Sequence, residues 1–239
     1  MTKKMPEKWE SSLKAINAVQ VAFDMDEKIQ YEIRRKALED GIREFNDRSL
    51  KSLVVEVQRF SRLVNDLYDL SRAEAGDLSY RMESLNLIDV LQHAADSFGP
   101  QFQEKGLALS FSEGDQELLI LADPARLSQL ISNLLANSLR YTDAPGRTDI
   151  QCAAVQGGFV SIVIEDSAPG VPTEALERIF DRLYRVESSR NVLHGGGGLG
   201  LAICKAIVEA HQGSIRAQPS GSDMGGVRIE ILLPTDGGQ

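Results

Sequence analysis

The sequence is poor in cysteine, has no excess of basic residues and contains no long apolar run. Its two cysteines, Cys152 and Cys204, lie in apolar stretches without metal-ligand spacing, so we predict buried, reduced thiols. The net charge of -9 argues against non-specific nucleic-acid binding, which needs clustered Lys and Arg to neutralise phosphates. No stretch approaches the ~20 apolar residues of a membrane helix, and no apolar signal-peptide core follows the first residues. We therefore expect a cytoplasmic chain without a membrane segment or a nucleic-acid partner.

Glycine and proline are almost absent from the first 74 residues, which predicts long helices there. Apolar residues recur every three or four positions at first, and two interleaved seven-residue series follow. The first stripe is Trp9, Leu13, Ile16, Val19 and Phe23, and the two series are Leu50, Val57, Val64 and Leu53, Phe60, Leu67. We predict a helical dimerisation region over residues 1–75. A hairpin could bury this seam by itself, but a homodimer, forming a four-helix bundle, buries more of it and is favoured.

Residues 76–239 have a different texture, with most of the glycines and short alternating apolar runs. The patterns predict strands at 107–111, 117–121, 148–155, 160–166 and 227–233, and helices at 87–98, 124–139 and 199–210. Asp123 and Pro124 suit the N-cap and first turn of the second helix. Gly157 and Gly158 between two strands predict a hairpin turn. The expected class is α+β, a sheet with helices on one face.

The first candidate functional stretch is NLLANSLRYT, on the helix that Asp123 opens. Asn133 and Asn137 are four residues apart and share a helix face, so their carboxamide oxygens could bind a hard cation such as Mg²⁺. Arg140 offers a phosphate donor and Tyr141 an aromatic face. Taken alone, the stretch is better explained as a solvated polar face.

The second stretch is EDSAPGVP, at the end of an apolar strand. The Asp166 carboxylate could accept a hydrogen bond from an adenine amino group, and Gly170 would allow a ligand to approach closely. The same residues could simply form a strand-ending turn.

The third stretch, HGGGGLGLAI, predicts a glycine loop followed by a helix that begins at Gly200. The free N–H groups of a helix N-terminus favour anions. Its match to G-x-G-x-x-G is weak, because a polar segment precedes it instead of a buried strand. No G-x-x-x-x-G-K-[ST] motif occurs, which excludes a P-loop.

In this order, with IFDRLYRVESSR between the second and third, the stretches resemble the N, G1, F and G2 boxes of sensor histidine kinases. The resemblance runs from about residue 38 to 234, and LEDGIREF, LVNDLYDLSRAEAG and DSAPGV look most like envelope-stress kinases of the BaeS type. It implies a Bergerat-type α/β sandwich of the GHKL group that binds ATP and Mg²⁺ and acts on a response regulator receiver domain.

The resemblance also implies roles for individual residues. Asn133 and Asn137 would hold Mg²⁺ and phosphate oxygens, Asn133 as a catalytic residue, and Asp166 would bind the adenine amino group. The other implied contacts are Arg140 with phosphate, Tyr141 along the adenine, Arg185 with the γ-phosphate as a catalytic residue, Gly170 in the turn, and Gly196, Gly198, Leu199 and Gly200 in and after the lid. Ala168 and Gly197 depart from the usual pattern, where Gly, and Ser or Thr, are common.

Histidine is scarce, and this departs most from the family pattern. The acceptor of such kinases lies on the first dimerisation helix, in a motif like H-E-L-R-T-P, and its expected place here is near Ala22. The three histidines, His93, His194 and His211, all follow the helical region and lack that motif. Residues 1–37 do not match the family, which could reflect an engineered chimera or a natural rearrangement.

Three functions therefore compete. The first is a histidine kinase core that transfers the γ-phosphoryl group of Mg-ATP to a histidine. The second is an ATP-binding regulatory protein without autokinase activity. The third is a related ATPase, which would use a Glu to activate water where this chain has Asn133, a side chain that cannot act as a base.

Overall fold

The computed structural model describes residues 80–112, 117–167, 169–186, 198–221 and 224–236. The chain divides into two compact units, Met1–Asn65 and Asp66–Gln239, and all of the described residues belong to the second. The predicted helical region, its heptad seam and the domain boundary after residue 75 lie outside the described residues and stay predictions. Within the described part, no helix is long and apolar enough to cross a membrane.

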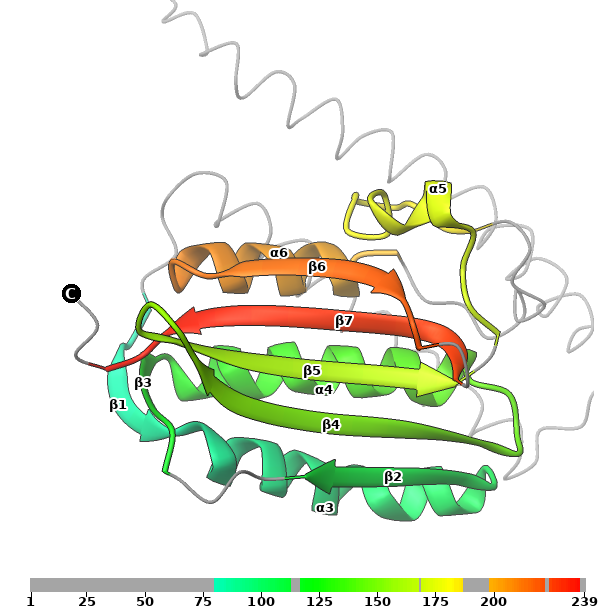
Figure 1. Ribbon diagram of the computed structural model, residues 1–239, viewed down its shortest axis with the longest axis horizontal. Helices are drawn as coiled ribbons and strands as arrows, with labels where there is room; N and C mark the ends of the chain where they lie inside the picture. The colour runs from blue at the N-terminus through cyan, green and yellow to red at the C-terminus, as the bar shows by residue number, and fades with distance from the viewer. Residues whose placement is uncertain (1–79, 113–116, 168, 187–197, 222–223, 237–239) are drawn as a thin grey trace, which may run out of the picture. The chain divides into compact units, whose positions relative to one another are not determined.

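A mixed five-stranded sheet forms the centre of this unit (Figure 1). In spatial order its strands are β2 (Leu107–Ser112), β4 (Gly146–Val155), β5 (Phe159–Ser167), β7 (Gly225–Pro234) and β6 (Ser214–Pro219). The first pair is parallel and the other pairs are antiparallel. Gly157 and Gly158 connect β4 to β5 at φ +89 and +76, which confirms the predicted hairpin turn.

Three helices cover one face of the sheet: α3 (Leu87–Glu104), α4 (Pro124–Tyr141) and α6 (Gly200–Ala210) (Figure 1). Every second residue of β5, namely Val160, Ile162 and Ile164, is at most 2% exposed, as expected for the side that packs against helices. The short helix α5 (Thr173–Leu176) lies near β6. The predicted α+β class, with helices on one face, is confirmed. Cys152 and Cys204 are buried, also as predicted.

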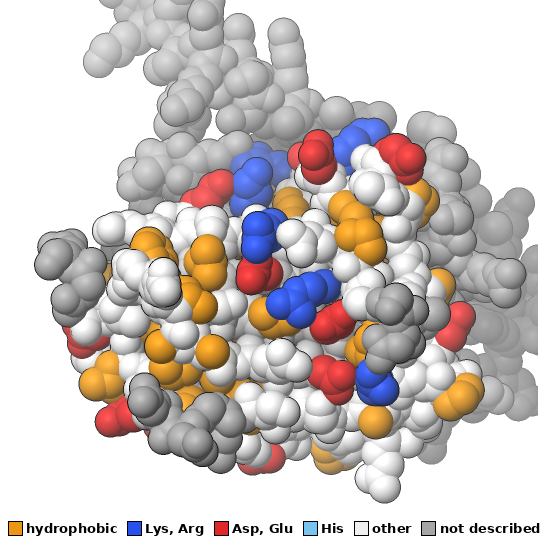
Figure 2. Space-filling model, viewed as in Figure 1, with side chains coloured by type: hydrophobic (Ala, Val, Ile, Leu, Met, Phe, Trp, Pro, Cys, Tyr) orange, Lys and Arg blue, Asp and Glu red, His pale blue; other side chains and the backbone are white. Residues whose placement is uncertain are grey.

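No helix of the described residues covers the other face of the sheet, and Figure 2 shows acidic and basic side chains next to one another over part of it, with hydrophobic side chains beside them. They form ion pairs between neighbouring strands. Arg228 Nη1 lies 3.2 Å from Glu165 Oε2, and Arg216 pairs with Glu230. The charges of this face therefore largely neutralise one another, and the predicted nucleotide-binding residues lie elsewhere.

Some elements differ from the prediction. Helix α3 continues six residues past the predicted end and contains Pro100, because the extra turn buries Phe102 completely. The strand expected at 117–121 is β3 (Leu119–Ala122), and it pairs with β1 (Glu83–Asn86) in a separate two-stranded sheet. Neither β1 nor the edge strand β6 was predicted, because both are short and largely exposed.

The start of α4 follows the prediction closely. Asp123 Oδ1 accepts hydrogen bonds from the N–H groups of Ala125 and Arg126 at 3.0 and 3.1 Å, and its Oδ2 accepts from Arg81 N at 2.9 Å. The N–H of Asp123 donates to His211 Nε2 at 2.9 Å. The cap therefore ties the start of α4 to the end of α6 and to the residues before β1.

Candidate functional site

Helix α4 brings the predicted N-box side chains to the beginning of α6. Asn133 Nδ2 donates to the carbonyl oxygen of Gly200 at 3.4 Å, which joins two sequence motifs 67 residues apart. This contact uses the amide nitrogen, so Asn133 Oδ1 is the atom suited to a hard cation. Asn137 lies one turn further along the same helix face and is half-buried.

Asp166 lies near the end of β5, where it faces α4 and β7. Its Oδ1 accepts a hydrogen bond from Val227 N at 2.7 Å, and its Oδ2 accepts one from Ser138 Oγ at 3.0 Å. Burial raises the pKa of Asp166 to about 6, a shift that the two hydrogen bonds oppose and that the nearby charge of Glu165 adds to. A carboxylate held in this way retains lone pairs that can accept from a ligand.

The backbone around Asp166 leaves no room for larger residues. A Cβ on Gly226 would lie 2.1 Å from the carbonyl oxygen of Asp166 and 2.6 Å from its Oδ1. A Cβ on Gly170 would lie 3.0 Å from the carbonyl oxygens of Gly225 and Gly226. Gly170 therefore permits close packing of the protein's own backbone, next to the candidate adenine acceptor.

Thr148 of β4 lies directly opposite Asp166 in the strand register, so both side chains are on the helix side of the sheet. Its hydroxyl group is fully buried and has no hydrogen-bond partner among the described residues. Buried hydroxyls nearly always have a partner, so this atom is suited to bind a water molecule or a polar group of a ligand.

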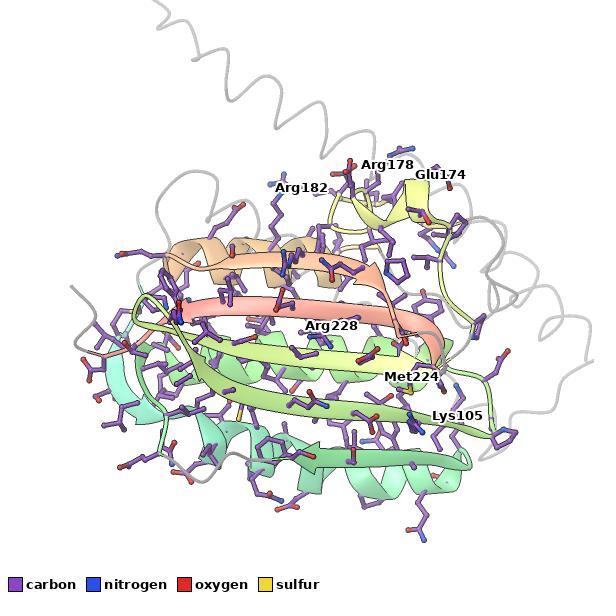
Figure 3. The ribbon with its side chains drawn as sticks, viewed as in Figure 1. Lys105, Glu174, Arg178, Arg182, Met224 and Arg228 are labelled. Carbon is purple, nitrogen blue, oxygen red and sulfur yellow. The ribbon has the colours of Figure 1, made fainter. Side chains whose placement is uncertain are left out.

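The last turn of α4 carries Arg140 and Tyr141, and the Arg140 guanidinium carbon lies 6.0 Å from the centre of the Tyr141 ring. Lys105 closes the end of the helix, because its Nζ donates to the carbonyl oxygens of Leu139, Arg140 and Thr142 at 2.5, 3.2 and 2.8 Å. Figure 3 shows Lys105 and Met224 toward the same end of the sheet, the end at which β5 stops. A side chain from the end of α3 therefore holds the main chain of the last turn of α4, which carries the phosphate and aromatic candidates.

The segment that resembles the F box contacts the residue just before Leu199. Leu183 N donates to the carbonyl oxygen of Gly198 at 2.9 Å, and both residues have left-handed backbones, with φ +59 and +66. A Cβ on Gly198 would lie 2.9 Å from Leu183 Cα, so only glycine fits there. Leu199 is buried at the start of α6, Arg185 is exposed, and Gly196 lies outside the described residues.

The structure therefore brings together Asn133 with Gly200, and Asp166 with the helix that carries Asn137, Arg140 and Tyr141. Sequence reasoning missed Ser138, Thr148, Val227 and Gly226. Ser138 stands inside the polar run NSLRYT, and Gly226 belongs to a glycine pair at the start of a predicted strand. The polar run and the glycine pair mark these positions as unusual, but neither pattern indicates that Ser138 and Gly226 lie next to Asp166 in the fold.

Comparisons with known proteins agree with this arrangement. Residues 122–237 match the family described as histidine kinase-, DNA gyrase B-, and HSP90-like ATPase. The chain is 44% identical over 201 residues to the signal transduction histidine-protein kinase BaeS of Escherichia coli strain K12, which covers 84% of this chain and 42% of BaeS. It is 36% identical over 185 residues to the sensor histidine kinase CusS of the same strain, which covers 77% of this chain and 37% of CusS.

A solved histidine kinase structure has the same fold as this chain. The histidine kinase AdeS of Acinetobacter baumannii has a TM-score of 0.68 at 24% identity, over 86% of this chain and 93% of AdeS, which supports the fold.

The chain belongs to the sensor histidine kinases, and its described part has the ATP-binding α/β sandwich of that family, as predicted. Within the family it is BaeS-like. It spans less than half the length of these curated relatives.

Proposed function

We propose that the chain binds Mg-ATP at the end of β5 and acts as the ATP-binding catalytic part of a two-component sensor histidine kinase. The observation that carries this proposal is Asp166, held between Ser138 and Val227 with acceptor capacity to spare. Family membership supports the same ligand, and so does the fully buried Thr148 hydroxyl opposite Asp166.

In this proposal each residue has a defined part. Asp166 accepts from the adenine amino group, while Tyr141 lies along the ring and Arg140 donates to phosphate. Asn133 and Asn137 would hold Mg²⁺ through their carboxamide oxygens, and the ion would offset phosphate charge. Arg185, exposed within the F-box segment, would approach the γ-phosphate.

The acceptor is expected to come from outside the histidines of this chain. His211 is 3% exposed and both of its ring nitrogens are engaged, one by Asp123 N and the other with the carbonyl oxygen of Ile207 at 2.7 Å. His194 lies outside the described residues, and its sequence neighbours include no carboxylate that would orient an imidazole. We therefore expect Mg-ATP binding without a stable phosphohistidine on this chain.

Incubation with radiolabelled Mg-ATP tests this, with the chain alone and with a separate dimerisation domain that carries an acceptor histidine. We expect acid-labile, base-stable label only on the added domain. Label on this chain alone would contradict the absence of an acceptor, and mapping it to His93, His194 or His211 would identify the site. Absence of label in both reactions, with ATP bound, would favour the ATP-binding regulatory function.

We also propose that the helical region forms a homodimer and that the kinase serves a response regulator receiver domain. The predicted heptad seam supports the first point, and family membership the second. Phe60→Glu should give a monomer in light scattering, because it would bury a charge without a partner. Wild-type chain that is already monomeric at about tens of micromolar, a typical range for such seams, would contradict the dimer.

A further inference from the structure

The contact between Ser138 and Asp166 is a polar feature of the site that the sequence motifs do not assign. Ser138 is buried on α4, with 4% of its surface exposed, and its hydroxyl donates to Asp166 Oδ2 at 3.0 Å. The opposite oxygen, Oδ1, accepts from Val227 N of β7 at 2.7 Å. Two donors from two different elements therefore hold the carboxylate plane, with one on each oxygen.

The Asp166 carboxylate, held in this way, presents only acceptors to a ligand. An ionised carboxylate has no donor, and each oxygen that accepts one hydrogen bond can accept another. A purine with a 6-amino group donates into such a site. In the same pose, a purine with a 6-oxo group would bring its own lone pairs against the carboxylate, because its N1–H donor lies one ring position away, and this mismatch is costly in a buried place.

We propose that Ser138 is a positioning residue that keeps Asp166 an acceptor, so that this pair selects 6-amino over 6-oxo purines and loses that selection when Asp166 takes up a proton. The inference rests on the proposed ATP site. A proton on Oδ2 reverses the contact, because the carboxyl O–H can then donate to Ser138 Oγ. The serine hydroxyl hydrogen becomes available to a 6-oxo group, and discrimination falls.

Burial, the two hydrogen bonds to Asp166 and the nearby charge of Glu165 together determine the pH at which this happens. Glu165 precedes it on β5 and is paired with Arg228 of β7, while Arg140 and Tyr141 follow Ser138 on α4. β4 places uncharged Thr148 opposite Asp166. Burial raises the pKa of Asp166 to about 6, against the opposing effect of Val227 N–H and Ser138 Oγ–H. The pKa is raised, so the ionised acceptor is complete above that pH and is lost as the pH falls through it.

The test is the ratio of ATP to ITP affinity, measured by calorimetry on the full chain from pH 5 to pH 8. The two nucleotides carry the same triphosphate, so its titration cancels in the ratio. Between pH 8 and pH 5 we expect the preference for ATP to fall by about tenfold, because about one Asp166 in ten is ionised one pH unit below its pKa. A preference that does not change over this range would overturn the inference.

Three variants assign the effect to Ser138. Ser138→Ala removes a donor to the charged form, so the midpoint of the ATP preference should move upward by about one pH unit. Ser138→Thr keeps the hydroxyl and should restore the wild-type midpoint. Ser128→Ala, on the exposed side of α4, is the matched control and should leave the profile unchanged. An unmoved midpoint in Ser138→Ala would overturn the role of Ser138.

Asp166→Asn provides a second, independent measurement. Its amide places a donor beside the base at every pH, so the ratio of ATP to ITP affinity should be low and independent of pH. A wild-type ratio in this variant would also overturn the inference. If the wild-type chain binds neither nucleotide at any pH, the proposed ATP function fails and the inference fails with it. ATP binding with a constant ratio would overturn only the inference.

Discussion

One aspartate contacts α4 near each of its ends: Asp123 at the start of the helix and Asp166, through Ser138, near its end. The pKa values of these two aspartates are shifted in opposite directions. Burial alone would raise the pKa of Asp123, but three backbone N–H groups and the Arg126 guanidinium outweigh burial and hold that pKa below its usual value. Asp166 has one backbone N–H, one serine hydroxyl and the acidic neighbour Glu165, so burial dominates and its pKa is raised to about 6. The protein satisfies the first carboxylate by itself and leaves the second able to accept from a ligand.

This difference distinguishes a carboxylate that the protein itself satisfies, Asp123, from the one that we propose binds a ligand, Asp166, without reference to sequence motifs. Both are largely shielded from solvent and both accept hydrogen bonds from residues far away in the chain. The helix N-terminus at Asp123 supplies donors in the number that a carboxylate needs. The end of β5 supplies fewer, and such incomplete satisfaction with a raised pKa is typical of functional sites.

The largest expected effect comes from removing the proposed adenine acceptor, Asp166. Asp166→Ala should weaken ATP binding by about 1–3 kcal/mol, because the adenine amino group would be buried without its acceptor. Calorimetric titration of the full chain with Mg-ATP measures this. Asp149→Ala, on the open face of the sheet, is the matched control and should bind normally. Unchanged affinity in Asp166→Ala would show that the adenine site is elsewhere.

Removing the N-cap of α4, Asp123, should have the opposite effect: it should lower the stability of the protein and leave its ATP affinity nearly unchanged. Asp123→Ala should lower the free energy of unfolding by about 1–2 kcal/mol, because three backbone N–H groups lose their acceptor. The ATP affinity of the folded protein should stay within about twofold, since Ser138 and Asp166 lie at the other end of α4. Urea unfolding gives the first quantity, and Asp123→Ser, which retains a cap, should recover most of the stability. A selective loss of ATP affinity without destabilisation would remove the distinction between the two ends.

The sequence predicted what depends on neighbouring residues and missed what depends on packing across the fold. The Asp123 cap, the Gly157–Gly158 turn and α4 follow from short-range patterns, and the structure confirms them. Asp166 was a candidate because it ends an apolar strand. Its partners could not be predicted, because Ser138 is 28 residues away and Val227 is 61 residues away.

The missed strands have a similar explanation. β6 forms the edge of the sheet and pairs only with β7, so few of its residues need to be apolar. β1 has only four residues, and the sequence does not indicate that its partner, β3, belongs to a separate sheet. The expected metal ligands, Arg185 and Gly196 stay predictions, since their roles depend on a bound nucleotide or on residues outside the described part of the chain.

A third experiment compares how Asp166 and Asp123 make the stability of the protein depend on pH. The folded-state pKa of Asp166, about 6, lies above the ordinary value of the unfolded chain. The stability it contributes is therefore complete below the unfolded pKa and is lost as the pH rises through about 6. Asp166→Asn, which cannot ionise, should be more stable than wild type by about 1 kcal/mol at pH 8 and similar to it at pH 5.

Chemical denaturation of both proteins at the two pH values measures this difference. Asp123→Asn should behave in the opposite way, because the depressed pKa of Asp123 makes its stabilisation present at high pH and lost as the pH falls. An Asp166→Asn variant that is less stable than wild type at pH 8 would show that the carboxylate is as well satisfied as that of Asp123.

The smallest expected effect concerns the cation that closes α4. Lys105 is exposed, yet its Nζ donates to three carbonyl oxygens at the C-terminus of the helix, where a positive charge is favourable. Lys105→Met keeps the length of the chain but loses these bonds, so we expect a stability loss of about 0.5 kcal/mol, in the range for helix-end charges near the surface. Because the last turn carries Arg140 and Tyr141, ATP affinity should also fall by about twofold to threefold. Lys205→Met, an exposed lysine on α6, is the matched control and should change neither quantity. Equal effects in the two lysine variants would show that the contacts of Lys105 do not position the end of α4. The proposed contact of this end of the helix with the nucleotide would then depend on Asp166 and not on Lys105.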